Sequence, residues 1–430
     1  MKSRTSSYPH GDTAWFTHDR FGMFIHWGLY ALPARHEWIK HHERITDESY
    51  QKYFDHFNPD LYDPAAWARA AREAGMKYVV ITSKHHEGFC LWDSKYTDYK
   101  ATATPYGRDL LKPFIEAFHA EGLKVGFYYS IIDWHHPDFP VDRLHPRRDD
   151  KAFRKQEKDR DVSKYAKYMH NQIKELLTHF EIDILWCDFS YPGSDGKGRD
   201  DWQSEKLVRM IRKLRPNIML NDRLDLPGSA DFVTPEQYVP AGGLTDDNGN
   251  PAVWEGCQTF SGSWGYYRDE ASWKSVPMLV QMLIDHVSKG GNLLLNVGPT
   301  ARGTFDARAT ERLAGMGAWM QAHARSIYGC TAAPKEFAVP PDCRYTWNPE
   351  TKRLYLHLFA WPFGSVHLPG LGGNVAYAQV LNDASEITMR QITHDSTLAR
   401  TCGPDCLTLD LPVQKPPVEV PVIELFLKNE

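Results

Sequence analysis

Short apolar segments alternate with amphipathic helical patterns from about residue 20 to residue 325. Most of these segments are apolar throughout, which is typical of strands buried on both faces of a parallel sheet. Repeated strand and helix units over roughly 300 residues favour a (β/α)8-like TIM barrel, with an open doubly wound sheet as the alternative. The dinucleotide-binding form of the open sheet loses its main support, because no Gly-x-Gly-x-x-Gly sequence follows the first strand.

The same pattern predicts where the barrel elements lie. The expected strands are residues 21–26, 77–82, 124–130, 182–187, 217–221 and 292–297, with shorter candidates near 232 and 257. The expected helices are residues 64–75, 110–121, 151–179, 201–214, 275–288 and 306–325. Residues 225–275 are rich in Gly and Pro and are expected to be irregular.

The pattern changes after Ala333, where short strand candidates are separated by Gly, Pro and Asn. This spacing is typical of a small all-β unit, most simply a β-sandwich. We therefore predict two domains, a (β/α)8-like barrel over residues 1–332 and a C-terminal β-sandwich over residues 333–430.

Composition excludes several classes of partner. The net charge of -5 and the pI near 6.5 give no general attraction to nucleic acid or to anionic membranes. No apolar run approaches the roughly 18 residues of a membrane span, and the first residues lack the apolar core of a signal peptide. We expect a cytoplasmic protein, or a periplasmic or secreted one if a leader is missing from this chain.

The seven cysteines have no zinc-site spacing and are expected to be free thiols, with a Cys402–Cys406 disulfide as the alternative.

Chemically active side chains gather where the predicted strands end. They are His26, Trp27, His85, His86, Glu87, Tyr128, Ser130, Asp133, Trp186, Asp188, Asn221, Asp222, Arg223, Glu236, Trp254, Glu255 and Asn296. The opposite strand ends carry ordinary residues such as Met76, Lys124 and Pro216. Active sites of β/α barrels form at the carboxyl ends of the strands, so this asymmetry predicts a pocket there.

Each candidate also has a structural explanation. Asp188 could cap a helix, His26 could be a core histidine and Arg223 could form an ion pair. The pair His85-His86 is harder to explain in this way, because neighbouring residues after a strand cannot both face the core.

Two chemistries fit such a pocket, namely glycoside hydrolysis with two carboxyl groups and metal-dependent hydrolysis with His and carboxylate ligands. The His-x-His spacing of metal-binding barrels is absent after the first strand, and 14 Trp residues favour a sugar site.

Seven sequence blocks in a fixed order then resemble glycoside hydrolase family 29, the α-L-fucosidases, over roughly residues 12–325. The blocks are FGMFIHWG, TSKHHEGFCLWDS, FYYSIIDWHHPD, ILWCDF, NDRL, TPEQYV and SKGGNLLLNVGPT. The resemblance implies a cofactor-free retaining enzyme, a barrel that lacks one or two helices, and a second β-sandwich domain. It makes Asp188 the nucleophile. The substrate-binding residues that it implies, together with the tryptophans we expect at the sugar, are His26, Glu37, Trp38, His85, His86, Tyr128, Trp186, Arg223 and Trp254.

The acid/base residue is less regular in that family. Glu236 matches a Thr-x-Glu-like block that lies 13 residues after Arg223, and we favour it, whereas Glu255 is the alternative. The retaining mechanism requires Asp188 to be ionised and Glu236 to be protonated. We expect Glu236 to be buried, which would favour its protonated form.

The resulting hypothesis is an exo-α-L-fucosidase that releases terminal fucosyl groups from fucosylated oligosaccharides or glycoconjugates through a covalent fucosyl-aspartate. The alternatives are another barrel hydrolase, resembling an α-galactosidase or using a metal, and an inactive fucose-binding protein. We expect no metal and no cofactor. The preferred linkage, transfer to acceptors and the oligomeric state stay open.

Overall fold

The computed structural model describes residue 8 and residues 10–246, 249–391, 402–403 and 405–428. Among these residues, seven parallel strands form one curved sheet in the order β5-β4-β3-β2-β1-β7-β6. The strands are β1 (Phe21–Ile25), β2 (Tyr78–Lys84), β3 (Lys124–Ser130), β4 (Ile184–Asp188), β5 (Met219–Leu220), β6 (Glu255–Thr259) and β7 (Asn292–Val297). Nearly all of their residues are buried, as apolar strands between two layers must be.

An extended segment, residues 231–236, lies between β5 and β6 and closes this sheet into a barrel. Parallel bridges pair Asn221 with Phe232, and Glu236 with Cys257. The backbone N–H of Asp231 also donates to the carbonyl of Leu220 at 2.7 Å. We call residues 231–236 the closing segment. It includes the strand candidate near residue 232, and it completes the (β/α)8-like barrel that the sequence predicts.

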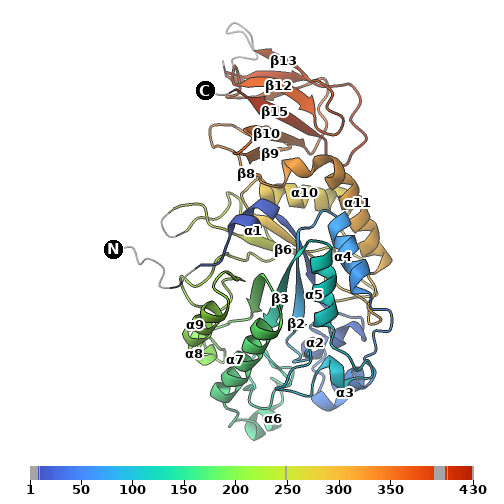
Figure 1. The fold of residues 1–430 in the computed structure, drawn as a ribbon, viewed down its shortest axis with the longest axis vertical. Coiled ribbons are helices and arrows are strands. Elements are labelled where there is room, and N and C mark those ends of the chain that lie inside the picture. The colour runs from blue at the N-terminus through green and yellow to red at the C-terminus, as the bar shows by residue number, and fades with distance from the viewer. Residues whose placement is uncertain (1–7, 9, 247–248, 392–401, 404, 429–430) are drawn as a thin grey trace, which may run out of the picture.

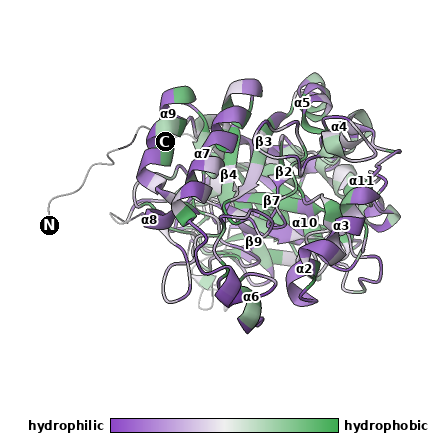
Figure 2. Cartoon of the chain, turned by 90° about the horizontal axis from the view of Figure 1, so that it is seen from below, coloured by the Kyte–Doolittle hydropathy of each residue, from purple (hydrophilic) through white to green (hydrophobic). Residues whose placement is uncertain are grey.

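Helices surround the strands, and Figure 2 shows hydrophobic strands inside a ring of helices with many hydrophilic residues. The helices are α1 (Ala14–Asp19), α2 (Ile39–His42), α3 (Asp47–Asp55), α4 (Pro64–Glu73), α5 (Leu111–Ala120), α6 (Lys151–Gln156), α7 (Val162–His179), α8 (Arg199–Trp202), α9 (Ser204–Leu214), α10 (Val276–Val287) and α11 (Ala307–His323). Within the described ranges, none of them is long and apolar enough to span a bilayer.

Two predicted helices are each divided in two. The expected helix 151–179 is interrupted between α6 and α7, where the side chain of Asp161 accepts the backbone N–H of Ser163 and starts a new helix. The expected helix 201–214 is interrupted at Gln203, whose φ of 50° is left-handed. Residues 221–246 and 249–275 contain no helix, so the irregular region is confirmed there.

The C-terminal part forms a β-sandwich of two antiparallel sheets. Its strands are β8 (Thr331–Ala332), β9 (Cys343–Asn348), β10 (Arg353–Leu358), β11 (Ser365–Leu368), β12 (Val375–Val380), β13 (Thr388–Gln391), β14 (Leu407–Asp410) and β15 (Val422–Leu427). β8 pairs with β9, so the predicted division after residue 332 falls at the end of a strand that belongs to the sandwich. No disulfide joins Cys402 to Cys406, which are both described.

The sandwich packs beside α10 and α11, at one end of the barrel. Arg344 of β9 donates to Asp285 of α10 at 2.6 Å, and Trp319 of α11 donates to the carbonyl of Val420 at 2.8 Å. Helices α2, α3 and α6, which follow the carboxyl ends of strands, lie at the other end (Figure 1). The pocket predicted at those strand ends is therefore remote from the sandwich.

Candidate active site

Most of the residues predicted for the site meet in one cavity at the carboxyl ends of the strands. This inner cavity is small. It is lined by Phe24, His26, Trp38, His85, His86, Tyr128, Trp186, Asp188, Phe189, Glu236, Cys257 and Trp264. Its walls are therefore mainly aromatic rings and imidazoles, with two carboxyl groups.

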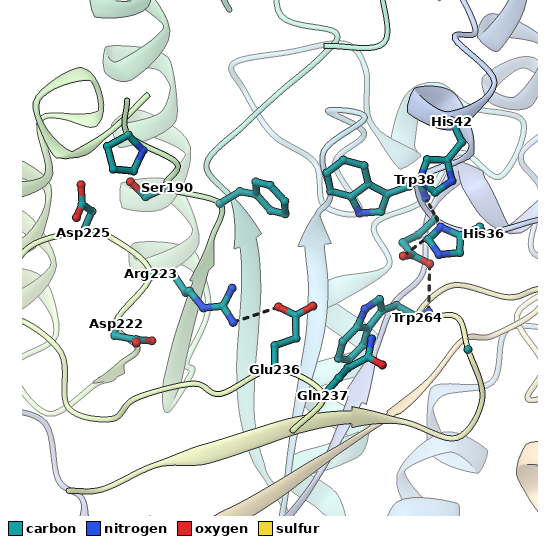
Figure 3. Close-up of a pocket in the computed structure, with 14 residues that line it drawn as sticks. His36, Trp38, His42, Ser190, Asp222, Arg223, Asp225, Glu236, Gln237 and Trp264 are labelled. Atoms are coloured by element: carbon teal, nitrogen blue, oxygen red, sulfur yellow. Dashed lines mark hydrogen bonds and ion pairs between the residues drawn. The ribbon is translucent and has the colours of Figure 1, made fainter. Parts of the chain in front are cut away.

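A wider cleft opens outside the inner cavity. It is lined by His36, Glu37, Trp38, His42, Phe189, Ser190, Pro192, Asp222, Arg223, Asp225, Glu236, Gln237, Gly262 and Trp264. Figure 3 shows Glu236 between Arg223 on one side and Trp264 on the other. Because Glu236 lines both hollows, it lies where the inner cavity opens into this outer cleft.

Asp188 is the last residue of β4, and its carboxylate is almost fully buried. The hydroxyl of Tyr128 donates to Oδ2 at 2.8 Å, and Nη1 of Arg223 donates to Oδ1 at 3.1 Å. Burial raises the pKa of Asp188 to about 6, and the nearby charge of Glu236 acts in the same direction. The charge of Arg223 and the Tyr128 hydrogen bond act against this rise. Asp188 is therefore ionised at neutral pH and becomes protonated as the pH falls through about 6.

Glu236, at the end of the closing segment, is more exposed than the sequence analysis expects. Its side chain is 44% exposed, and Oε2 accepts a hydrogen bond from Nη2 of Arg223 at 3.2 Å. The expected burial is therefore wrong for the protein without substrate. The reason is that the closing segment carries Glu236 to the mouth of the inner cavity rather than to its floor.

Arg223 holds the two carboxylates together. Its terminal nitrogens contact Asp188 and Glu236, while Nε donates to Oγ1 of Thr234 at 2.8 Å. The guanidinium also lies 5.2 Å from the centre of the Trp186 ring, within the range of a cation–π contact. A planar guanidinium that hydrogen-bonds to three residues can keep two negatively charged carboxylates close to each other.

Replacing Arg223 with methionine is expected to move the acidic limb of the pH–activity profile to higher pH, by about one to three pH units. The charge of Arg223 lowers the pKa of Asp188, so its removal lets that pKa rise above about 6. Loss of the ionised carboxylate then begins at a higher pH. The measurement is kcat/KM for an aryl α-L-fucoside from pH 4 to 8. Arg223→Lys keeps the charge and should keep the limb near its original position, whereas an unchanged limb in Arg223→Met would contradict this reading.

The three predicted histidines are buried and uncharged. Burial lowers the pKa of His26 to about 3, and it lowers the pKa of His85 and of His86 well below the usual value. Nδ1 of His86 bonds to Oγ of Ser130 at 2.7 Å, whereas Nδ1 of His85 is buried without a partner among the described residues. Neutral imidazoles can both donate and accept, which suits recognition of sugar hydroxyls.

Glu37 and Trp38 line the outer cleft, and Trp38 also lines the inner cavity. Oε2 of Glu37 accepts the backbone N–H groups of Trp264 and Gly265, at 3.1 and 2.8 Å. Oε1 of Glu37 lies 3.3 Å from Nδ1 of His36. The Trp38 ring packs edge-on against His86, with 4.9 Å between centroids. Glu37 therefore fixes the backbone beside Trp264 and contacts His36 at the outer cleft.

Comparison with known proteins agrees with this geometry. The family model described as Alpha-L-fucosidase matches residues 3–325. The chain belongs to the α-L-fucosidase family. Human plasma alpha-L-fucosidase is 31% identical over 378 residues, which cover 81% of this chain and 76% of the human protein. Membership in this family, glycoside hydrolase family 29, makes the protein a glycosidase.

Two solved fucosidase structures extend the similarity to the whole chain. Alpha-L-fucosidase isoenzyme 1 from Paenibacillus thiaminolyticus is 48% identical, with a TM-score of 0.90, and covers 97% of this chain and 99% of its own. An α-L-fucosidase from Bacteroides thetaiotaomicron is 29% identical, with a TM-score of 0.83, and covers 99% and 98%. The latter was solved as a trapped covalent intermediate with 2-fluoro-fucosyl fluoride in a glutamate-to-glutamine mutant. The barrel and sandwich of this chain are thus the fucosidase architecture.

Trp254, predicted to contact substrate, lies elsewhere in this fucosidase. It precedes β6 at the amino end of the barrel, its ring lies directly against Gly291, and Nε1 points toward the carbonyl of Lys289 at 3.4 Å. It lines neither hollow. The predicted substrate contact is therefore wrong, because Trp254 comes before its strand rather than after it.

Glu255, the alternative acid/base residue, is the first residue of β6 and is fully buried. It accepts hydrogen bonds from the hydroxyl of Tyr78 at 2.6 Å and from Nε1 of Trp186 at 3.2 Å. Burial raises the pKa of Glu255 to about 7. Trp186 separates it from the inner cavity, so Glu255 supports the cavity floor and does not reach a leaving group.

Two residues of the site, Trp264 and Phe189, were not predicted from the sequence, and Asn296 was predicted only as a strand-end residue without a role. Trp264 and Phe189 line both hollows, and Asn296 bonds to His26. Trp264 lies in the irregular region, where no periodic pattern orients a side chain. Phe189 follows the strand that ends in Asp188 and has a left-handed φ of 83°. Asn296 was noted at a strand end, and its position there was the signal that could have identified it.

Proposed function

We propose that the protein is a retaining exo-α-L-fucosidase that releases a terminal fucosyl group from fucosylated oligosaccharides or glycoconjugates. The observation that carries the proposal is the contact of both Asp188 and Glu236 with one guanidinium, that of Arg223. Retaining glycosidases need two carboxyl groups beside the same anomeric carbon. The trapped covalent intermediate of the Bacteroides relative supports the retaining route.

The inner cavity presents the polar groups that recognition of one terminal sugar needs. Buried imidazoles of His26, His85 and His86 surround it. A bound fucose would supply hydroxyls to these imidazoles, and its apolar face and methyl group would meet aromatic rings such as Trp264. An analogue lacking one hydroxyl would leave a buried polar group unpaired, which gives selectivity.

In the first step, the Asp188 carboxylate forms a bond to the anomeric carbon while the bond from that carbon to the leaving oxygen breaks. Glu236 donates its proton to the leaving oxygen, which departs through the outer cleft. In the second step, Glu236 removes a proton from water, the water oxygen bonds to the anomeric carbon, and Asp188 leaves as a carboxylate. Two inversions retain the configuration.

Proton NMR of a fresh reaction tests the proposal. With an aryl α-L-fucoside, the first fucose released should be the α anomer, and the β anomer should appear later through mutarotation. Early β-fucose would exclude the covalent route. Turnover of an aryl α-galactoside without turnover of the fucoside would favour an α-galactosidase-like hydrolase. Binding of fucose without turnover of either substrate would favour an inactive fucose-binding protein.

A further inference from the structure

Asn296 joins two walls of the inner cavity. It is the fifth residue of β7, and its side chain is buried between His26 and the loop that carries Trp264. Oδ1 bonds to Nδ1 of His26 at 2.7 Å, and Nδ2 donates to the carbonyl oxygen of Trp264 at 2.6 Å. We propose that Asn296 is a positioning residue that fixes His26 as a hydrogen-bond acceptor for a fucose hydroxyl and couples it to Trp264. The inference rests on the proposed function.

The orientation of the Asn296 amide follows from its partners. The Trp264 partner is a carbonyl oxygen, which only accepts, so the NH2 group must face it and the amide oxygen must face His26. An amide oxygen also only accepts, so Nδ1 of His26 must carry the proton. A neutral imidazole has one N–H, and Nε2 of His26 is therefore an acceptor.

Nε2 of His26 has no hydrogen-bond partner among the described residues, and the ring lines the inner cavity. Groups on several elements face this ring. His85 lies 5.6 Å away and Tyr128 lies 5.5 Å away, between ring centroids, while Asp188 and Glu236 line the same cavity and His36 adds a weaker electrostatic effect. Burial keeps the pKa of His26 low, so the ring stays neutral and Nε2 stays available to a hydroxyl donor.

The second contact of Asn296 sets the aromatic wall. The Trp264 ring lies 5.1 Å from the His26 ring, and the backbone N–H of Trp264 donates to Glu37. Trp264 is thus held through its carbonyl by Asn296 and through its N–H by Glu37. A single amide therefore sets the spacing between the acceptor and the ring that contacts the sugar.

The test compares Asn296→Leu with the control Asn292→Leu. Asn292 lies on the same face of the same strand, is equally buried, and donates to the carbonyl of Phe16 at the other end of the barrel. Both substitutions should lower the melting temperature, since each leaves buried groups unpaired. Only Asn296→Leu should lower kcat/KM for an aryl α-L-fucoside, by about 10- to 100-fold, mainly through KM. An equal kinetic loss in Asn292→Leu would overturn the proposal.

A second comparison separates positioning of His26 from a general packing role. In a His26→Ala background, Asn296→Leu should lower kcat/KM by a smaller factor than it does in the wild type, because only the contact with Trp264 is then left to lose. Full additivity of the two losses would overturn the proposal. Wild-type turnover of the aryl fucoside is measured alongside, so its absence identifies a failure of the proposed function instead.

Asn296→Asp offers a conservative variant, because it keeps an acceptor facing Nδ1 of His26. It should retain more activity than Asn296→Leu at the upper end of the pH range. The new carboxylate should raise the pKa of His26, so activity should be lost at a higher pH as the solution is acidified. Equal losses in the two variants at every pH would show that Asn296 only fills space, and would overturn the inference.

Discussion

Replacing Asp188 with glycine is expected to lower kcat for aryl α-L-fucosides by a factor on the order of 10⁴, because no carboxylate remains to bond to the anomeric carbon. The fold should persist, since the ionised carboxylate is buried at a cost that raises its pKa to about 6. Sodium azide should restore part of the rate and yield a fucosyl azide of inverted configuration, as a small anion can occupy the space left by the side chain. Rates with and without azide, and the configuration of the product, are the measurements.

Asp183 provides a matched control for this variant. It precedes β4 at the opposite end from Asp188 and accepts Nζ of Lys124 at 3.0 Å and the backbone N–H of Val125 at 3.0 Å. Asp183→Gly should reduce the melting temperature and keep a near-normal kcat. Wild-type turnover in Asp188→Gly would show that another group attacks the sugar, and the assignment of the nucleophile would then be wrong.

Replacing Glu236 with alanine should slow hydrolysis in a way that depends on the leaving group. Fucosides with alkyl or sugar leaving groups need a proton, so their kcat/KM should fall by a factor of about 10² to 10⁴. A dinitrophenyl fucoside needs little protonation, and its first step should slow by less than about tenfold. The measurement is the dependence of kcat/KM on leaving-group acidity, which should be steep in the variant and shallow in the wild type.

Glu255→Gln is the control for the acid/base assignment. Because Glu255 lies beneath Trp186 and outside both hollows, its substitution should affect all leaving groups equally. A steep leaving-group dependence in Glu255→Gln, together with a shallow one in Glu236→Ala, would transfer the role to Glu255. The two carboxylates are thus distinguished by kinetics alone.

The barrel could be predicted because its strands are buried on both sides and its helices are amphipathic. The segment ending in Trp186-Cys187-Asp188 illustrates this, since an apolar strand that ends in a carboxylate predicts both the strand and a site. The site residues on the regular strands β1 to β4 follow the same reasoning. The interruption between α6 and α7 is harder to anticipate, because a side-chain cap at Asp161 overrides a helical pattern that continues through it.

The errors concentrate between residues 225 and 275, where no periodicity shows which end of a strand a residue occupies. Trp254 and Glu255 come just before or at the start of β6, so they lie at the amino end of the barrel, although their residue types suit an active site. Trp264 follows the same strand and reaches the pocket. Exposure of Glu236 depends on how the chain returns across the barrel, which only tertiary structure determines.

Asp188 and Glu236 are held in place by different parts of the fold. Asp188 belongs to β4, whose hydrogen bonds to β3 continue up to Asp188 itself, while Glu236 ends a closing segment held by isolated bridges. No helix backs that segment among the described residues of 221–275. Residues 237–246, which follow Glu236, could therefore be redesigned without disturbing the hydrogen bonds between β3 and β4 that position Asp188. One aim of such a redesign is to favour transfer of the fucosyl group to a sugar acceptor over its transfer to water. The nucleophile is thus held by a regular sheet, whereas the acid/base residue lies on a segment that can be redesigned.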